Sequence, residues 1–261
     1  MPAGQLPPDG DLRIGAVTLP AGRRVTPFGA RRPVAWITRQ PVLDVPRAWA
    51  MLSDAQEQTG LVPVSVIGGH AQETRPWEAW ELYPRPVGDL DGLDAAEVLG
   101  SCWDSRIPGE EEDAEAAGER APFSRRFPGL APRQDEELTV AERGRAIGSL
   151  KAAWLALVPA ARAADVVPLT GWVPGNWTDS SLLVGAVLRS WEDRFGARLV
   201  EMGPDEIRLL VDRPPRTLQA AQAIAAEHFA FADECGGKGL STVSRIAADL
   251  ISNPFWSFWW D

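Results

Sequence analysis

The sequence predicts an α+β fold: a small α/β sandwich as C-terminal domain, with a mixed, mainly antiparallel sheet, plus an N-terminal α/β region. Short apolar runs typical of strands alternate with segments of helical periodicity along both halves of the chain. In the C-terminal half, two strand-like runs are joined by only a short turn, which favours antiparallel pairing. With 261 residues, the chain is long enough for one large domain or two small ones.

The N-terminal region contains a strand, a helix and a second strand in quick succession. Residues 34–38 and 61–67 are apolar runs of strand length. Between them, the Asp-Val-Pro triplet at 44–46 marks the start of a helix. This order predicts a βαβ unit with parallel strands. Before it, residues 12–25 form two short apolar runs separated by Gly22, and they predict a hairpin.

Residues 106–138 divide the chain into three parts. The stretch holds four prolines and the acidic run Glu110–Asp113. Such a composition buries too little apolar surface to offset the entropy lost on ordering. We therefore expect an N-terminal α/β region over 1–105, an acidic Pro-rich linker or loop over 106–138, and a C-terminal α+β domain over 139–261. An interaction tail is the alternative for the middle stretch.

The C-terminal domain has the clearest periodicity. Thr139 and Glu142 fit a capping box at a helix start. A strand-like run at 155–158 and a short helix or turn at 163–169 follow. The later elements alternate as helix, strand, strand, helix, helix and strand, at residues 179–195, 198–202, 207–211, 217–229, 241–250 and 254–261. We expect the helices to cover one side of the sheet.

Four motifs in this half stand out: Gly-Trp at 171–172, LRSWEDRFGA at 188–197, EHFAF at 227–231 and the closing FWSFWWD at 255–261. Together, over about residues 155–261, they resemble a bacterial family known only as domain of unknown function 4253. The resemblance implies a cytoplasmic bacterial α+β domain. It brings no established activity and no assigned catalytic residues. The glycine-rich stretch 232–239 departs from the family pattern.

The charge and hydropathy of the chain favour some classes of binding partner and disfavour others. The chain has 26 basic and 36 acidic residues, a net charge of −10, which disfavours nucleic-acid binding. An acidic surface suits a basic protein partner, or serves solubility alone. No apolar run approaches the roughly 18 residues of a membrane span. Because residues 1–10 are polar and Pro-rich, without the basic-then-apolar pattern of a signal peptide, and the two cysteines lie far apart, we expect a cytoplasmic protein without a disulfide framework.

Motifs for catalysis or cofactors are not found in the sequence. Gly237-Lys238 is not followed by Ser or Thr, so a phosphate-binding loop is not predicted. Glu227, His228, Asp233 and Cys235 are all of metal-ligand type, but Glu227 and His228 are adjacent and would point about 100° apart on a helix. We therefore predict no cofactor, no metal site and no catalytic set.

Tryptophans and one charged helix segment supply the candidate binding residues. The chain has 12 Trp against one Tyr, and Trp usually lies in a core or an interface. In the WEDRF segment, Glu192 and Arg194 offer groups for acid–base chemistry, although local ion pairs on a solvated face explain them as well. One face of the closing strand is either an aromatic binding surface or a packing surface. The candidates are Trp172, Trp191, Glu192, Arg194, His228, Asp233, Trp259 and Asp261.

Three functions compete on these grounds. The leading hypothesis is a non-enzymatic protein-binding protein, an adaptor or an immunity-type protein that masks a basic partner. The alternative is an enzyme of unknown class with a site in a cleft between the two halves, which requires Glu192, Arg194, His228 and Asp233 to converge. The third is an assembly protein that oligomerises through its aromatic C-terminus. The sequence does not fix the oligomeric state.

Overall fold

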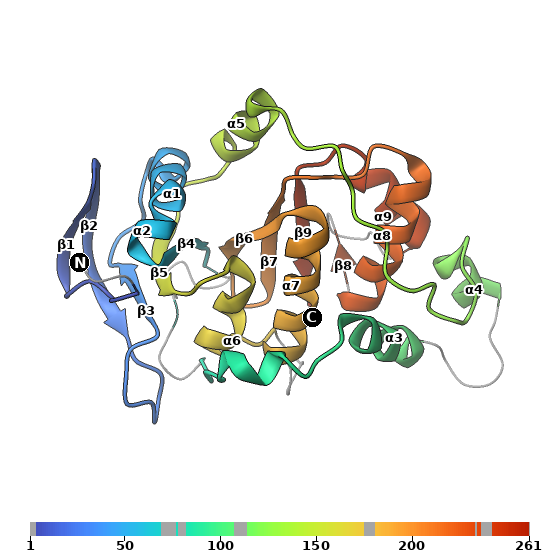
Figure 1. Ribbon diagram of the computed structural model, residues 1–261, viewed down its shortest axis with the longest axis horizontal. Helices are drawn as coiled ribbons and strands as arrows, with labels where there is room; N and C mark the ends of the chain where they lie inside the picture. The colour runs from blue at the N-terminus through green and yellow to red at the C-terminus, as the bar shows by residue number, and fades with distance from the viewer. Residues whose placement is uncertain are drawn as a thin grey trace.

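In the computed structural model, one mixed sheet runs along the molecule (Figure 1). The structure describes residues 4–68, 77, 82–106, 114–174, 181–232, 234–235 and 242–260. Within them, nine strands follow the order β1-β2-β3-β5-β4-β6-β7-β9-β8. Of the strand pairs described, β4–β6 is parallel and the others are antiparallel. The predicted α+β fold with a mixed, mainly antiparallel sheet is confirmed.

The strands are β1 (Gly10–Ile14), β2 (Val17–Val25), β3 (Ala35–Thr38), β4 (Leu61–Val66), β5 (Trp154–Pro159), β6 (Ala197–Met202), β7 (Glu206–Val211), β8 (Glu234–Cys235) and β9 (Phe255–Trp259). The α-helices are α1 (Val45–Asp54), α2 (Gln56–Thr59), α3 (Ala95–Ser105), α4 (Ala114–Arg120), α5 (Val140–Gly148), α6 (Val166–Thr170), α7 (Ser181–Phe195), α8 (Leu218–Phe231) and α9 (Val243–Leu250). Two 3₁₀ helices, η1 (Val87–Leu90) and η2 (Ala163–Asp165), complete the described elements.

The predicted βαβ unit is only partly right. β3, α1 and β4 follow one another as expected, but β3 and β4 do not pair. β5 lies between them and is antiparallel to both. Its Leu155–Val158 segment is fully buried, as expected for an apolar strand in the interior of a sheet. The sequence around β3 and β4 does not indicate that another strand lies between them.

The predicted N-terminal hairpin is present, but its turn lies at residues 15–16 and not at Gly22. Gly22 sits within β2, where the Trp36 indole of β3 crosses it. A Cβ atom at position 22 would stand 2.2 Å from Cζ2 of Trp36, so only glycine fits there. The glycine therefore marks a close approach inside a strand, which a sequence reading mistakes for a turn.

The C-terminal elements follow the predicted order, with one addition. The Thr139 hydroxyl accepts a hydrogen bond from the Glu142 amide, and the Glu142 carboxylate accepts one from the Thr139 amide, which is the expected capping box. The helices and strands from β5 to β9 then appear as predicted. The addition is β8, two residues that pair antiparallel with β9.

The sheet separates two hydrophobic cores. The larger one joins buried residues of α3, α6, α7, α8 and α9 to one face of the sheet. The smaller one joins α1 and the buried residues of the β1–β2 hairpin to the other face. The helices after β5 thus share one side of the sheet, as predicted, and α1 and α5 cover the other side.

Residues 121–138, the strap, cross the helices of the larger core and are anchored at several points. Trp103 of α3 donates its indole N–H to the Arg125 carbonyl at 2.8 Å. The Leu138 amide donates to the Asp212 carbonyl at 2.7 Å. This part of the predicted linker is therefore docked both on α3 of the N-terminal region and on the C-terminal half.

The predicted division into 1–105, 106–138 and 139–261 stays a prediction about folding units. In the structure, the sheet crosses these boundaries, because β5 from the third segment pairs with β3 and β4 from the first. The order of the strands therefore interleaves the two halves of the chain.

Candidate functional site

A buried ion pair joins α7 to α8. Arg194 of α7 binds Glu227 of α8 in a two-pronged arrangement, Nη1 to Oε1 and Nη2 to Oε2, both at 2.7 Å. Glu227 is fully buried, and the Trp191 indole N–H donates to its Oε2 at 2.8 Å. The Ser190 hydroxyl accepts from Nε of Arg194 at 3.1 Å. A buried charge pair with satisfied hydrogen bonds fixes geometry rather than adding much stability.

The same pair holds the backbone of the strap. The Ala131 amide donates to Oε1 of Glu227 at 2.6 Å, and Nη1 of Arg194 donates to the Ala131 carbonyl at 2.8 Å. Both polar backbone groups of one residue are thereby satisfied by one ion pair, and the methyl side chain is buried. Arg194, Glu227 and Ala131 form what we call the clamp, a device that fixes the strap to the helices.

His228 is buried beside the clamp and stays neutral. Its ring lies between Trp256 and Phe258, at centroid distances of 4.6 and 4.7 Å, and 5.1 Å from Trp191. Burial, and then the positive charge of Arg194, lower the pKa of His228 from 6.5 to about 3. Its Nε2 is buried and has no hydrogen-bond partner among the described residues. An enclosed neutral imidazole of this kind serves packing and is not placed to exchange protons with a ligand.

Glu192 lies apart from the clamp. Its Oε2 accepts from Nε of Arg162 at 3.2 Å, and the neighbouring Asp193 accepts from Nη2 of Arg162 at 2.6 Å. These contacts tie the segment before η2 to α7. Among Glu192, Arg194 and His228, none donates a hydrogen bond to another, so the convergence that a catalytic site needs is not found at these three residues.

The two remaining tryptophan candidates differ in exposure. Trp172 is buried, packs edge-on against Trp260, and donates its indole N–H to the Gly203 carbonyl at 2.7 Å. Trp259 lies on the opposite face of β9 from Trp256 and is partly exposed. One face of the closing strand is thus core, and on the other face Phe255 is buried in the smaller core while Trp259 is partly exposed. The candidates Asp233 and Asp261 lie outside the described residues.

An acidic strip runs along η1 and α3, and the candidate residues did not include it. The stretch 86–105 has five acidic residues and no basic one. All five side chains are exposed. The strip consists of Asp89, Asp91, Asp94, Glu97 and Asp104.

The strip has a clear local origin. On α3, the acidic positions 94, 97 and 104 are spaced by three and seven residues and share one helix face, opposite the buried Leu99 and Trp103. Only Asp91 forms an ion pair with a described residue, at 3.2 Å from Arg189. This helical spacing of carboxylates is visible in the sequence and is the signal that the sequence analysis missed.

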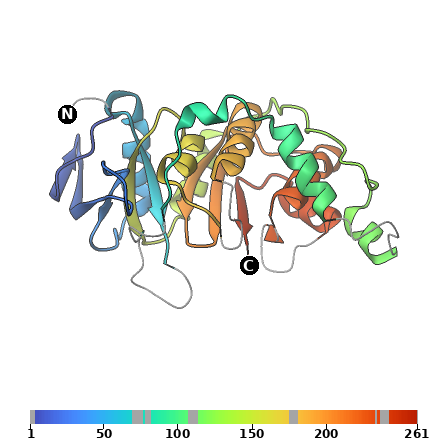
Figure 2. The same ribbon diagram turned by 90° about the horizontal axis from the view of Figure 1, so that it is seen from below.

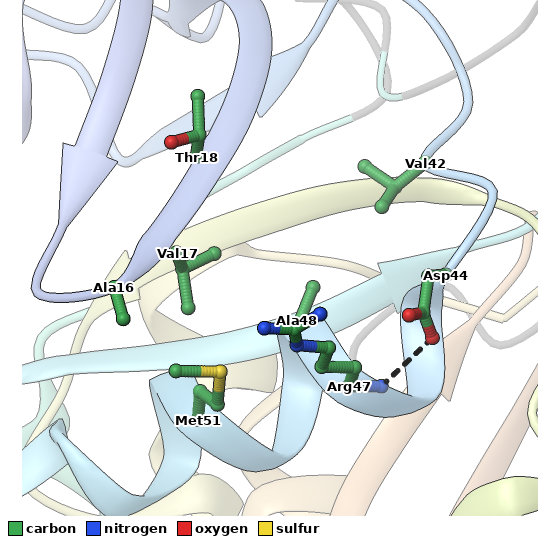
Figure 3. A pocket seen from close by; sticks show the side chains of 8 residues that line it. All are labelled: Ala16, Val17, Thr18, Val42, Asp44, Arg47, Ala48 and Met51. Atoms are coloured by element: carbon green, nitrogen blue, oxygen red, sulfur yellow. Dashed lines mark hydrogen bonds between the residues drawn. The ribbon is translucent and has the colours of Figure 1, made fainter.

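A small pocket lies at the other end of the molecule, between the β1–β2 hairpin and α1 (Figure 3). It encloses about 250 Å³. Figure 3 shows Val17 of the hairpin on one side and Met51 of α1 on the other, with Arg47 and Asp44 near the start of α1. The Asp44 carboxylate caps α1 by accepting from the Arg47 amide at 3.3 Å, so its one evident role there is structural.

The described ranges contain neither a metal-binding cluster nor a membrane-spanning helix. Within them, no three His, Cys, Asp or Glu side chains are grouped closely enough to hold a metal ion. The same ranges contain no helix that combines the length and the apolar character needed to cross a membrane. Cys102 and Cys235 are not joined by a disulfide.

The comparison with protein families concerns the C-terminal part of the chain. Residues 154–261 match the domain of unknown function DUF4253. The predicted resemblance is confirmed over these residues. The clamp residues Arg194 and Glu227 lie inside the DUF4253 part, whereas Ala131 and the acidic strip precede it. No curated protein and no solved structure matches the chain.

Proposed function

We propose that this protein is a non-enzymatic binding protein of the adaptor or immunity type, which acts in the cytoplasm and docks a basic protein partner on its acidic strip. The observation that carries the proposal is the strip itself. Five exposed carboxylates gather on η1 and one face of α3, with one ion pair among the described residues. Like charges held together raise the local negative potential, which steers a basic partner and sets its orientation.

The overall charge supports the same partner class. A net charge of −10 disfavours a nucleic acid, whose phosphates require a basic surface, and also disfavours an anionic membrane. Thiols without a disulfide suit a reducing compartment. The alternative of an enzyme in a cleft between the halves gains no support from Glu192, Arg194 and His228, because Glu192 pairs with Arg162 and His228 is enclosed by aromatic rings.

The test is a pull-down with the tagged full chain from its native cells, at low and at high salt. A strip variant, Asp89→Asn/Glu97→Gln/Asp104→Asn, avoids the helix cap at Asp94 and the ion pair at Asp91. A matched control variant neutralises three exposed acidic residues outside the strip, so that its net charge equals that of the strip variant: Asp54→Asn, Glu57→Gln and Asp135→Asn.

The proposal predicts a stoichiometric basic partner that the wild type and the control capture at low salt, and that the strip variant and high salt both lose. Equal capture by the strip variant would contradict docking on the strip. Recovery of the wild-type chain alone at both salt concentrations would contradict the binding function itself.

A further inference from the structure

The sheet ends in a strand with an unpaired outer edge. β1 is the first strand in the sheet order and pairs only with β2 among the described strands. Figure 1 and Figure 2 both place the β1–β2 hairpin at one end of the molecule, far from α3 and α4. The outward backbone N–H and C=O groups of β1 therefore face no described strand, which is the arrangement that accepts another strand.

The side chains of β1 carry opposite charges on one face. Asp11 and Arg13 are exposed, and Leu12 between them is buried toward the smaller core. Neither charged side chain forms an ion pair with a described residue. Nε of Arg13 donates to the nearby Gly15 carbonyl at 3.3 Å. Both charges thus remain available at the edge, on either side of the apolar residue at the middle of the strand.

We propose that β1 pairs with β1 of a second copy of this chain, antiparallel and centred on Leu12, so that the sheet continues through a two-fold axis. In this register, Asp11 of each copy lies opposite Arg13 of the other, and the two Leu12 side chains adjoin on the core side. Cross-strand neighbours of opposite charge attract at this spacing. The contact is isologous, so it closes after two copies.

The neighbouring registers are disfavoured by charge. Because side chains alternate between the two faces, an antiparallel pair that keeps Leu12 on the core side must be centred on a residue and not between two. Centring on Asp11 places two carboxylates opposite each other, and centring on Arg13 places two guanidinium groups opposite each other. Of these three registers, the one centred on Leu12 pairs unlike charges without setting like charges opposite each other. The Asp11-centred register would also place Arg13 opposite Asp9, but Asp9 already pairs with Arg39 and accepts from the Arg24 amide. The Asp-Leu-Arg order thus makes the edge complementary to itself.

This inference does not rest on the proposed function. The acidic strip lies on η1 and α3, away from β1 (Figure 2), so the two-fold contact leaves the strip open in both copies. The contact is small, and we expect a dimer that forms at high protein concentration and dissociates on dilution.

The test is sedimentation equilibrium of the full chain over a range of concentrations. Salt of about 0.15 M limits long-range repulsion between the acidic copies to a Debye length of about 8 Å. We expect a concentration-dependent monomer–dimer equilibrium for the wild type. Asp11→Arg and Arg13→Asp each create two like-charged pairs, and each should weaken association by about tenfold or more. Asp54→Arg, an equal charge change on α1, should leave the equilibrium unchanged.

Two further samples make the test specific for this register. The double variant Asp11→Arg/Arg13→Asp regains unlike pairs and should dimerise again. An equimolar mixture of the two single variants should associate more strongly than either variant alone, because their edges complement each other. A wild type that stays monomeric at every concentration would overturn the proposal. So would a wild-type dimer that persists in folded single variants, or a folded double variant that does not regain association.

Discussion

Replacing His228 with phenylalanine should change how the stability of the fold depends on pH. The imidazole is buried among Trp191, Trp256 and Phe258, and no residue that the structure describes forms a hydrogen bond with its Nε2. Phenylalanine keeps an aromatic ring in the same enclosure and removes the titratable group. The variant therefore isolates the proton linkage of this one side chain from that of the many surface carboxylates.

The size of the effect follows from the two pKa values of His228. In the folded chain the pKa is lowered from 6.5 to about 3, first by burial and then by Arg194. As pH falls below 6.5, the unfolded chain binds a proton that the folded chain does not, so the contribution present at neutral pH is lost between pH 6.5 and 3. With about 1.4 kcal/mol for each pKa unit, the wild type should lose about 2.5 kcal/mol more than the variant between about pH 7 and pH 4.5.

Urea unfolding of wild type and His228→Phe, followed by tryptophan fluorescence at several pH values, measures this difference directly. The two unfolding free energies should be nearly parallel above neutral pH and should diverge as the solution becomes more acidic, with the wild type losing more. Curves that stay parallel down to about pH 4.5 would show that the pKa of His228 is not lowered by folding, because the folded chain would then bind this proton as readily as the unfolded chain does.

Two further changes test the packing that positions the helices and the sheet. Glu227→Gln should lower the unfolding free energy by about 3–5 kcal/mol, because the largely buried charge of Arg194 then has no counter-charge. A loss below about 1 kcal/mol, measured by urea unfolding, would contradict this. Gly22→Ala should destabilise by about 1–3 kcal/mol, because the new Cβ meets the Trp36 indole at 2.2 Å. The matched Gly144→Ala, on the open surface of α5, should be neutral or stabilising by thermal unfolding, and equal effects of the two changes would refute the crowding at position 22.

Local signals predicted most of the elements well. The Thr139 capping box, the helix at α7 and the strand pair β6–β7 depend on residues close together in the sequence, and the structure confirms them. The pairing of β3 with β5 depends on residues more than a hundred positions apart. No local pattern encodes such a contact, so the predicted βαβ unit could not show that β5 lies between its two strands.

The site was harder to predict because the role of a charged side chain depends on whether the fold buries it and on which partner the fold brings to it. Arg194 and Glu192 are two residues apart on α7 and look equivalent in the sequence. Arg194 is held between α8 and the strap, whereas Glu192 pairs with Arg162 nearer the surface. Glu227 and Ala131 gain their roles only from the fold that brings them together. The acidic face of α3, by contrast, could have been found from its helical spacing alone.

Site-specific photo-crosslinking shows whether a partner docks on the acidic strip. Ser101 is exposed on α3 between the acidic positions, and Gln58 is exposed on α2 at another part of the surface. A photoreactive amino acid at either position leaves every charge of the chain in place. In native cells, we expect a crosslink to a basic protein from position 101 and none from position 58. A crosslink from position 58 with none from position 101 would contradict this expectation.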